Sequence, residues 1–311
     1  MPYLLMFMMS IAISMALTAL LARHAVTLGM IDYPDSRKVH RVPVPRVGGV
    51  GIVAGALVPL LLWLPASRES RGYMLGAVIL LVFGVWDDRK ELGHYVKFVG
   101  QFAAAAAVVY YGGLYVSRFP FLGLMPLAPE VGKPFTVFAI IGMINAVNHS
   151  DGLDGLAGGL SLLSLGCIIY LALLGGGDTV IAIAAATAGG VFGFLRYNTY
   201  PARVFMGDGG SQFLGLTLGY LAVLLTQHAN TALSAALPLL FLGLPIADIL
   251  GVFWLRVHHG LNWFRATKNH LHHRLLMLGF HHYESVVLIY TIQIGLVIAA
   301  VLMRYQSDTA I

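Results

Sequence analysis

The chain is poor in charge and in cysteine, and each shortage excludes a class of protein. Only 11% of its 311 residues are charged and 58% are hydrophobic, whereas a soluble domain carries about 25% charged residues. This balance excludes an ordinary soluble enzyme and is typical of an integral membrane protein. Cys167 is the single cysteine, so an intramolecular disulfide and a cysteine-rich metal site are both excluded.

A cleavable leader and a basic domain are also missing. The first apolar stretch, from Tyr3 to Leu21, is too long for the core of a signal peptide, and no small-residue cleavage site follows it. We therefore interpret it as a retained membrane span. The net charge of +5 is spread over the connections between apolar segments, and we expect no nucleic-acid partner.

Long hydrophobic runs are what the sequence has in abundance. A helix needs about 20 residues to cross a hydrocarbon core of about 30 Å, and ten apolar segments approach that length. We therefore expect an all-α integral membrane protein with about ten transmembrane helices, forming one polytopic domain over residues 1–311. The expected spans are approximately 3–22, 48–65, 71–86, 96–116, 134–148, 155–175, 179–195, 209–226, 232–255 and 285–303.

The basic residues divide unequally between the two sets of connections. Fourteen lie on the side that holds the connections 23–47, 87–95, 149–154, 196–208 and 256–284, and five lie on the opposite side. The positive-inside rule places the first set in the cytoplasm and both termini outside. Eleven of the 12 histidines lie on this same side. This gathering of polar chemistry at one face predicts an active site that faces the cytoplasm.

A transporter is the non-enzyme alternative. It more often places ionisable groups at mid-depth or shows an inverted repeat. The sequence shows no clear repeat, and Asp248 is one acid well inside an expected span. A transporter with a cytoplasmic anion site therefore remains the weaker interpretation.

Two acidic motifs stand where an apolar segment meets a polar connection. FGVWDDRKELGH, residues 83–94, places Asp87 and Asp88 side by side at the end of an expected helix. Adjacent carboxylates repel each other unless a cation or a shared proton compensates, although a solvated helix end explains a bare pair equally well. VFMGDGGSQFLG, residues 204–215, places Asp208 among glycines just before a helix. Such an acid suits Mg²⁺ shared with substrate phosphates, or is simply a helix cap.

Two basic motifs suit anions. DYPDSRKVHRVPVPRVGGVG, residues 32–51, carries Lys38 and Arg46 in a proline-containing loop, which is either a positive-inside anchor or a holder of phosphate. ATKNHLHHRLLMLGFHH, residues 266–282, contains His270, His272 and His273. Three histidines within four residues do not share one helical face, so hydrogen bonding to an anionic substrate is favoured over a zinc site.

A strip of polar residues straddles the end of another span. NAVNHSDGLDGLAGG, residues 145–159, places Asn145, Asn148, Asp151 and Asp154 three residues apart, which in a helix is one slowly drifting face. Amides and carboxylates in a cytoplasmic cleft can bind a metal or a nucleobase. Helix packing explains the glycines of this motif, but it does not explain the polar side chains.

Together these segments resemble the polyprenyl-phosphate N-acetylhexosamine-1-phosphate transferase family, the MraY/WecA/TagO superfamily. The resemblance rests on DYPDSRKVHRVPVPRVGG, GVWDDRKELGHYVKFVGQ, NAVNHSDGLDGLAGG, LRYNTYPARVFMGDGGSQFLG and NHLHHRLLMLGF, which occur in that order over nearly the whole chain. The HLHHRLL version of the histidine motif is similar to the WecA/TagO branch, which uses UDP-N-acetylglucosamine (UDP-GlcNAc). In the branch that uses UDP-MurNAc-pentapeptide, the corresponding motif has three contiguous histidines instead.

The resemblance implies an MraY-like fold, a reaction and a set of site residues. Undecaprenyl phosphate attacks UDP-GlcNAc, which gives undecaprenyl-diphospho-GlcNAc and UMP and initiates a lipid-linked cell-envelope glycan such as lipopolysaccharide or teichoic acid. Mg²⁺ is the implied cofactor, with Mn²⁺ as a substitute. By position, the implied metal ligands are Asp208 and Asn145; the catalytic acids are Asp87, Asp88 and Asp208; and the substrate-binding residues are Asp151, Asp154, Gly155, Asn198, Lys38, Arg46, His270, His272 and His273.

The resemblance also implies a location and partners. We expect a multi-pass protein of the bacterial inner membrane that contacts membrane lipid, and homodimers occur in the family. His149 stands where a more apolar residue is usual, and Ala266-Thr267-Lys268 stands where an acid often precedes the histidine motif. Another UDP-N-acetylhexosamine or UDP-MurNAc-pentapeptide is therefore the alternative donor.

Overall fold

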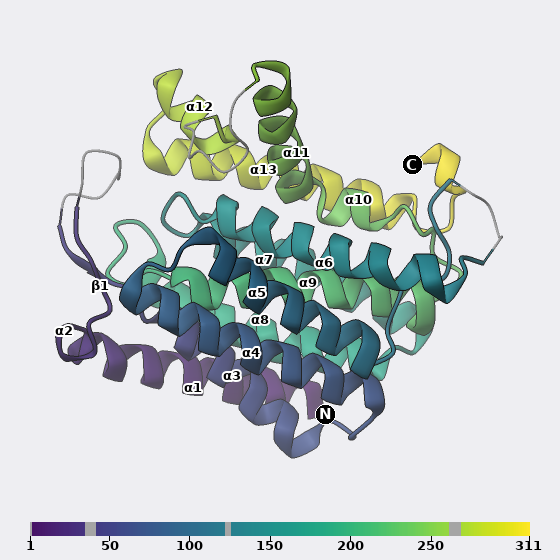
Figure 1. The fold of residues 1–311 in the computed structure, drawn as a ribbon, viewed down its shortest axis with the longest axis horizontal. Helices are drawn as coiled ribbons and strands as arrows, with labels where there is room; N and C mark the ends of the chain where they lie inside the picture. Colours follow the sequence, from purple (N-terminus) through teal and green to yellow (C-terminus); the bar gives the residue numbers. More distant parts are fainter. Residues whose placement is uncertain (1, 35–41, 122–125, 261–268) are drawn as a thin grey trace.

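The protein is described here by a computed structural model that covers residues 2–34, 42–121, 126–260 and 269–311. Helices make up nearly all of it (Figure 1). The helices are α1 (Pro2–Arg23), α2 (Ala25–Leu28), α3 (Gly48–Trp63), α4 (Arg68–Lys90), α5 (His94–Ala106), α6 (Pro129–Ser150), α7 (Leu156–Gly175), α8 (Asp178–Asn198), α9 (Gly207–Leu224), α10 (Pro238–Phe241), α11 (Gly243–His258), α12 (Leu271–Met277) and α13 (His282–Leu302). Short π-helical turns, η1 (Ala107–Tyr111) and η2 (Leu225–Ala229), extend α5 and α9, and a 3₁₀ turn, η3 (Asp308–Ala310), ends the chain.

The expected membrane helices are largely present. Among the described residues, seven helices are long and apolar enough to cross a membrane: α1, α4, α6, α7, α8, α9 with η2, and α13. Three further expected spans are also helical but shorter or divided: α3, α5 with η1, and α10 with α11. The prediction of an all-helical membrane protein is therefore confirmed at the level of seven candidate spans.

Helix α9 forms the centre of the bundle. Every residue in its most apolar 18-residue stretch is buried, and α3, α4, α6 and α7 surround it. Close approach of α4 depends on Gly84, where an added Cβ would lie 2.3 Å from the Cα of Gly209. This backbone contact brings the end of α4 against the start of α9, which is where the acidic motifs meet.

The expected span over residues 232–255 is not one continuous helix. It divides at Leu242 into α10 and α11, and α11 runs steeply across the direction of the other helices in Figure 1. Pro245 has no N–H to donate to Phe241, four residues earlier. The freed Phe241 carbonyl instead accepts from Ser164 Oγ at 2.7 Å and Gln293 Nε2 at 2.8 Å, as membrane helices require.

A small β-pairing departs from the all-α expectation. Strands β1 (Ile31–Asp32) and β2 (Val44–Pro45) pair antiparallel, and Phe205 N donates to the Pro45 carbonyl at 2.8 Å. The pairing holds the chain on either side of the basic loop against the segment that leads into α9. Both termini lie toward the end of the bundle opposite β1 (Figure 1).

Candidate active site

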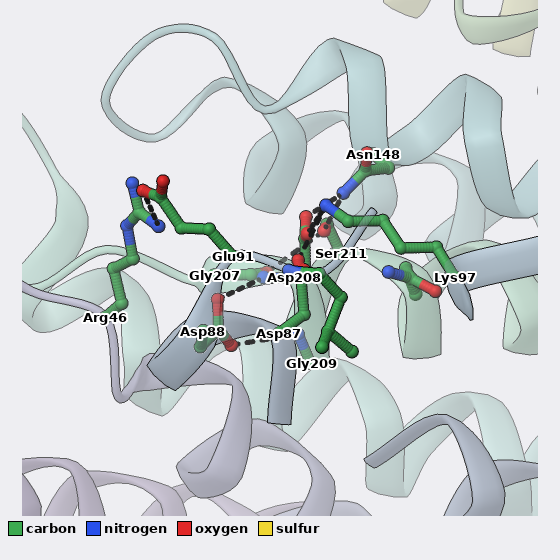
Figure 2. A network of polar contacts seen from close by, with 12 residues as sticks. Arg46, Asp87, Asp88, Glu91, Lys97, Asn148, Gly207, Asp208, Gly209 and Ser211 are labelled. Atoms are coloured by element: carbon green, nitrogen blue, oxygen red, sulfur yellow. Dashed lines mark hydrogen bonds and ion pairs between the residues drawn. The ribbon is translucent and has the colours of Figure 1, made fainter. Parts of the chain in front are cut away.

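Two aspartates from different helices hold one lysine between them. Asp87 lies near the end of α4, Asp208 at the start of α9, and Lys97 in the first turn of α5 (Figure 2). Lys97 Nζ lies 2.6 Å from Asp87 Oδ2 and 2.6 Å from Asp208 Oδ2. The two carboxylate oxygens therefore lie within twice that distance of each other. Carboxylates this close repel each other unless a cation lies between them, and Lys97 supplies that charge.

Asp88 has a different set of contacts from its neighbour Asp87. Its carboxylate accepts the backbone N–H of Asp208 at 2.8 Å and of Gly209 at 3.1 Å. The first N–H groups of a helix have no partner within it, and a carboxylate there is also favoured by the helix dipole. Gly207 makes room for this contact: its φ is +70°, and an added Cβ would lie 2.6 Å from the Asp88 carboxylate oxygens. Asp88 therefore caps α9 from a neighbouring helix.

The amides of α6 form two layers beside this centre. Asn148 Nδ2 donates to Asp208 Oδ1 at 2.5 Å and to Ser211 Oγ at 2.8 Å. Asn145, one turn deeper, donates instead to Gln101 Oε1 at 2.8 Å. In this structure Asn148 is the amide in contact with Asp208, and Asn145 belongs to the polar layer beneath it.

Arg46 lies at the edge of the acidic centre. Its guanidinium forms an ion pair with Asp32, and it lies 3.7 Å from Glu91 Oε1 (Figure 2). These contacts fix Arg46 near the Asp88 end of the site. Lys38, predicted to act with Arg46, lies outside the described residues.

A second group of predicted residues meets where α7 begins and α8 ends. Asp154 Oδ2 accepts the N–H of Ala202 at 2.9 Å, and the Asp154 N–H lies 3.1 Å from His282 Nε2. Gly155 N donates to Asn198 Oδ1 at 2.9 Å. The structure thus brings Asp154, Gly155 and Asn198 together at one place.

Asp151 lies between these two groups, just beyond the end of α6. Burial, together with the nearby carboxylates of Asp208 and Asp154, raises the pKa of Asp151 to about 7. Because α6 ends at Ser150, the polar strip that began on one helical face continues on a turn.

The histidine motif packs against α6 and α11. His270 Nδ1 lies 2.7 Å from Asp248 Oδ2, and the His149 ring stacks on His270 with 5.1 Å between centroids. The rings of His270 and His272 lie nearly parallel with 5.8 Å between their centroids, and the His272 and His273 ring centroids lie 4.2 Å apart. Burial and the neighbouring histidines lower the pKa of His272 to about 3. Since His149 follows Asn148 in α6, the histidines adjoin the acidic centre.

Several site residues were not singled out from the sequence. In the sequence Lys97 is one of the fourteen basic residues on the side of the site, and its place in an apolar helix that begins beside the acidic pair is the signal that could have singled it out. Gln101 lies one turn further along α5, and its Nε2 lies 3.4 Å from Gln212 Oε1 on α9. Asp248 was noted as an intramembrane acid, but its partner 22 residues away in the sequence was not foreseen.

The donor set around Asp208 suits a hard cation. The carboxylate oxygens of Asp87 and Asp208 face the Lys97 ammonium, and the Ser211 hydroxyl lies beside Asp208 through their shared contact with Asn148 Nδ2. Within the described part of the chain, no three His, Cys, Asp or Glu residues form a complete metal cage. Mg²⁺ typically binds through one or two carboxylates and takes its remaining ligands from water and substrate phosphates. The residues therefore fit Mg²⁺ better than zinc.

Comparisons with known proteins agree on one family. The sequence profile of glycosyl transferase family 4 matches residues 70–226. A probable undecaprenyl-phosphate N-acetylglucosaminyl 1-phosphate transferase of Bacillus subtilis strain 168 is 35% identical over 304 residues, which cover 96% of this chain and 84% of the relative. A decaprenyl-phosphate N-acetylglucosaminephosphotransferase of Mycolicibacterium smegmatis is 34% identical, covering 86% and 73%. An undecaprenyl-phosphate alpha-N-acetylglucosaminyl 1-phosphate transferase of Haemophilus influenzae is 32% identical, covering 84% and 76%.

Proposed function

The chain belongs to glycosyl transferase family 4, and we propose that it transfers N-acetylglucosamine 1-phosphate from UDP-GlcNAc to undecaprenyl phosphate. The relatives named above are transferases of this kind, and each aligns over most of this chain. A phosphate oxygen of the lipid attacks the β-phosphorus of UDP-GlcNAc, the bond to the bridging oxygen breaks, and UMP leaves. The product is undecaprenyl-diphospho-GlcNAc, which starts a lipid-linked cell-envelope glycan.

The observation that carries this proposal is the pair of carboxylates around one ammonium group. Transfer of a phosphoryl centre between two anions depends on positioning and charge neutralisation more than on a covalent catalyst. Lys97 Nζ is held by Asp87 and Asp208 and can contact substrate phosphates from that place. Asp87, the more buried of the two acids, is our candidate for orienting or deprotonating the lipid phosphate.

We assign the Mg²⁺ site to Asp208, with Asn148 beside it and Asn145 in the layer beneath. Asp208 would hold the ion, which when bound would supply positive charge to the diphosphate. Asp208 is suited to hold it because its carboxylate stands at the start of α9, where Asp88 fixes the backbone. Mn²⁺, which prefers similar oxygen ligands, is expected to substitute.

The remaining predicted residues are assigned to the donor and the lipid head group. Asp154, Gly155 and Asn198 form our proposed uridine pocket, with Asp151 between it and the metal ligands. The histidines 270, 272 and 273 contact the diphosphate or the sugar. Arg46 and Lys38 are assigned to the lipid phosphate.

An apolar groove on the same two helices as Lys97 and Asn148 suits the isoprenoid chain. Its volume is about 520 Å³, and it runs along α5 and α6. These helices also carry Lys97 and Asn148, so a phosphate at the acidic centre and a lipid tail in the groove would follow the same pair of helices. The lining residues are Phe102, Ala103, Ala106, Tyr110, Pro134, Val137 and Phe138.

We propose ten membrane spans in a bacterial inner membrane, with α3, α5 and α10–α11 added to the seven longer helices. The active site then faces the cytoplasm and both termini lie outside. The support for this orientation is the excess of basic residues in the connections at the site's end of the bundle. A homodimer stays a prediction from the family resemblance.

The experiment that tests this function is an assay of UMP release by the purified protein in nanodiscs, with undecaprenyl phosphate, Mg²⁺ and one UDP-sugar at a time. We expect UMP with UDP-GlcNAc and dependence on the lipid phosphate. Preference for another UDP-N-acetylhexosamine or for UDP-MurNAc-pentapeptide would change the donor while keeping the reaction. No UMP with any donor, together with flux of UDP-GlcNAc across vesicles, would favour the transporter instead.

A further inference from the structure

We propose that Asp248 is a positioning residue for the transfer reaction: it holds His270 so that Nε2 of the ring donates a hydrogen bond to the diphosphate of the sugar donor. This inference rests on the proposed function, because it assigns a substrate group to His270. Asp248 itself touches no substrate in this account and acts through the histidine.

Both carboxylate oxygens of Asp248 are used, one for the His270 ring and one for the backbone, and both side chains are largely buried. Asp248 Oδ2 lies 2.7 Å from His270 Nδ1, and Asp248 Oδ1 accepts the backbone N–H of Leu271 at 2.7 Å. The two side chains are 12% and 8% exposed. An acid in an apolar membrane helix is costly unless both of its oxygens are bonded, and such residues usually serve a function.

These bonds determine which ring nitrogen is available. A carboxylate can only accept, so Nδ1 of His270 must carry a hydrogen. Nε2, the other ring nitrogen, has no hydrogen-bond partner within the described part of the chain. A ring that donates to Asp248 through Nδ1 and to an anion through Nε2 is an imidazolium, whose charge lies between two anions. Orientation of a histidine by a carboxylate is a general device in active sites.

The ring is also fixed from a second side. His149, on α6, stacks on His270 with an interplanar angle of 25°. The Leu271 contact fixes the first turn of α12, which carries the rest of the motif. Asp248 thus connects α11 to the part of α6 that bears Asn148. The titratable groups in contact with His270 are Asp248, His149 and His272. Further out, His273 contacts His272, and the charges of Arg256 and Asp208 act on His149.

Asp248→Asn separates the two contacts of this carboxylate. The asparagine oxygen still accepts from Leu271 N, so the start of α12 keeps its cap. Its amide nitrogen is a donor and faces Nδ1, so Nδ1 must give up its proton to accept from it. The ring is then a neutral imidazole whose Nε2–H still donates to the diphosphate but brings no positive charge to it. We expect the Kd for UDP-GlcNAc, measured by calorimetry with Mg²⁺, to rise about tenfold or more, while the apparent Tm and the KM for undecaprenyl phosphate stay near wild type.

Three comparisons make this test specific. His270→Ala should weaken UDP-GlcNAc binding at least as much, and Asp248→Asn should add nothing in that background. Asp248→Glu, which keeps the carboxylate, should recover part of the affinity. Asp178→Asn is the matched control, because Asp178 also accepts a side-chain hydrogen bond, from Tyr3 at 2.7 Å, but lies at the other end of the bundle.

The ¹⁵N spectrum of labelled histidine gives a second measurement that does not depend on a folded variant. With UDP-GlcNAc bound, we expect both His270 nitrogens of the wild type to be protonated. Unchanged affinity in Asp248→Asn, additive losses in the double variant, or a wild-type His270 without a proton on Nδ1 would each overturn the proposal. A wild type that binds UDP-GlcNAc without releasing UMP would contradict the proposed function alone, since affinity and spectrum would still decide the role of Asp248.

Discussion

The carboxylate of Asp88 accepts the backbone N–H of Asp208 at 2.8 Å. The second member of the acidic pair therefore supports the residue that we assign to the metal, while the first member, Asp87, shares Lys97 with it. Two adjacent aspartates point to different partners because α4 ends against the first turn of α9. Asp88 stabilises the first turn of α9, whereas Asp87 accepts the Leu92 N–H with one oxygen and contacts Lys97 with the other. We propose that Asp87 faces the reacting groups.

Asp88→Ala tests this division of roles. It leaves two N–H groups of α9 without a partner, and the loss of a helix cap costs about 0.5–2 kcal/mol. We expect a lower apparent Tm together with a large loss of UMP release, because Asp208 loses its support. Asp87→Asn should lose activity with a Tm near wild type. An Asp88→Ala protein that is as stable as wild type but inactive would instead make Asp88 a chemical participant.

Lys97→Met removes the cation between the two acids. We expect UMP release to fall by about a hundredfold or more, which is the typical loss when one electrostatic contact to the transition state is removed. Without divalent cations its apparent Tm should fall below wild type because the carboxylates repel each other, and Mg²⁺ should restore more of its Tm than of the wild type's. Lys133→Met, which removes a lysine near Tyr110 and Tyr115, is the matched control. Equal rates in the two variants would refute this role of Lys97.

Removal of divalent cations should abolish turnover. EDTA is expected to stop UMP release, and Mg²⁺ or Mn²⁺ added in excess is expected to restore it, since the oxygen donors around Asp208 suit both ions. Zn²⁺ should not restore the full rate. Turnover that persists in excess chelator would remove the metal from the account.

His272 should make the protein sensitive to acid. Burial lowers its pKa to about 3, whereas a histidine in an unfolded chain has a pKa of about 6.5. Below about pH 6.5 the unfolded state therefore binds the additional proton, and stability falls as the pH is lowered. We expect the apparent Tm to drop less between pH 7.5 and 5.5 in His272→Gln than in wild type. His228→Gln, at an exposed position, should behave like wild type; an unchanged drop in His272→Gln would contradict this assignment.

Much of the fold was predictable because the length and hydrophobicity of membrane helices can be recognised in the sequence. The exception, residues 232–255, shows the limit of that signal. Proline is tolerated in membrane helices, so the pattern around Pro245 did not reveal a break. The break depends on Ser164 and Gln293, from two other helices, which satisfy the freed carbonyl of Phe241.

The sequence predicted which residues belong to the site better than it predicted which of them contact each other. The acidic and amide motifs do meet, but sequence spacing could not distinguish Asn145 from Asn148, because the rotation of α6 decides which amide reaches Asp208. Lys97 looked like any basic residue near a membrane surface. Its role depends on α5 packing beside α4 and α9, which is a tertiary relationship that no local pattern encodes.

The central claim is that Asp87 and Asp208 act at one centre in transfer of a sugar phosphate from UDP-GlcNAc to a lipid phosphate. The most direct measurement is the rate of UMP release by Asp208→Ala and Asp87→Asn, each shown to be folded by its apparent Tm. We predict that each variant loses about a hundredfold or more of the wild-type rate. Near-normal rates in both folded variants would contradict the account.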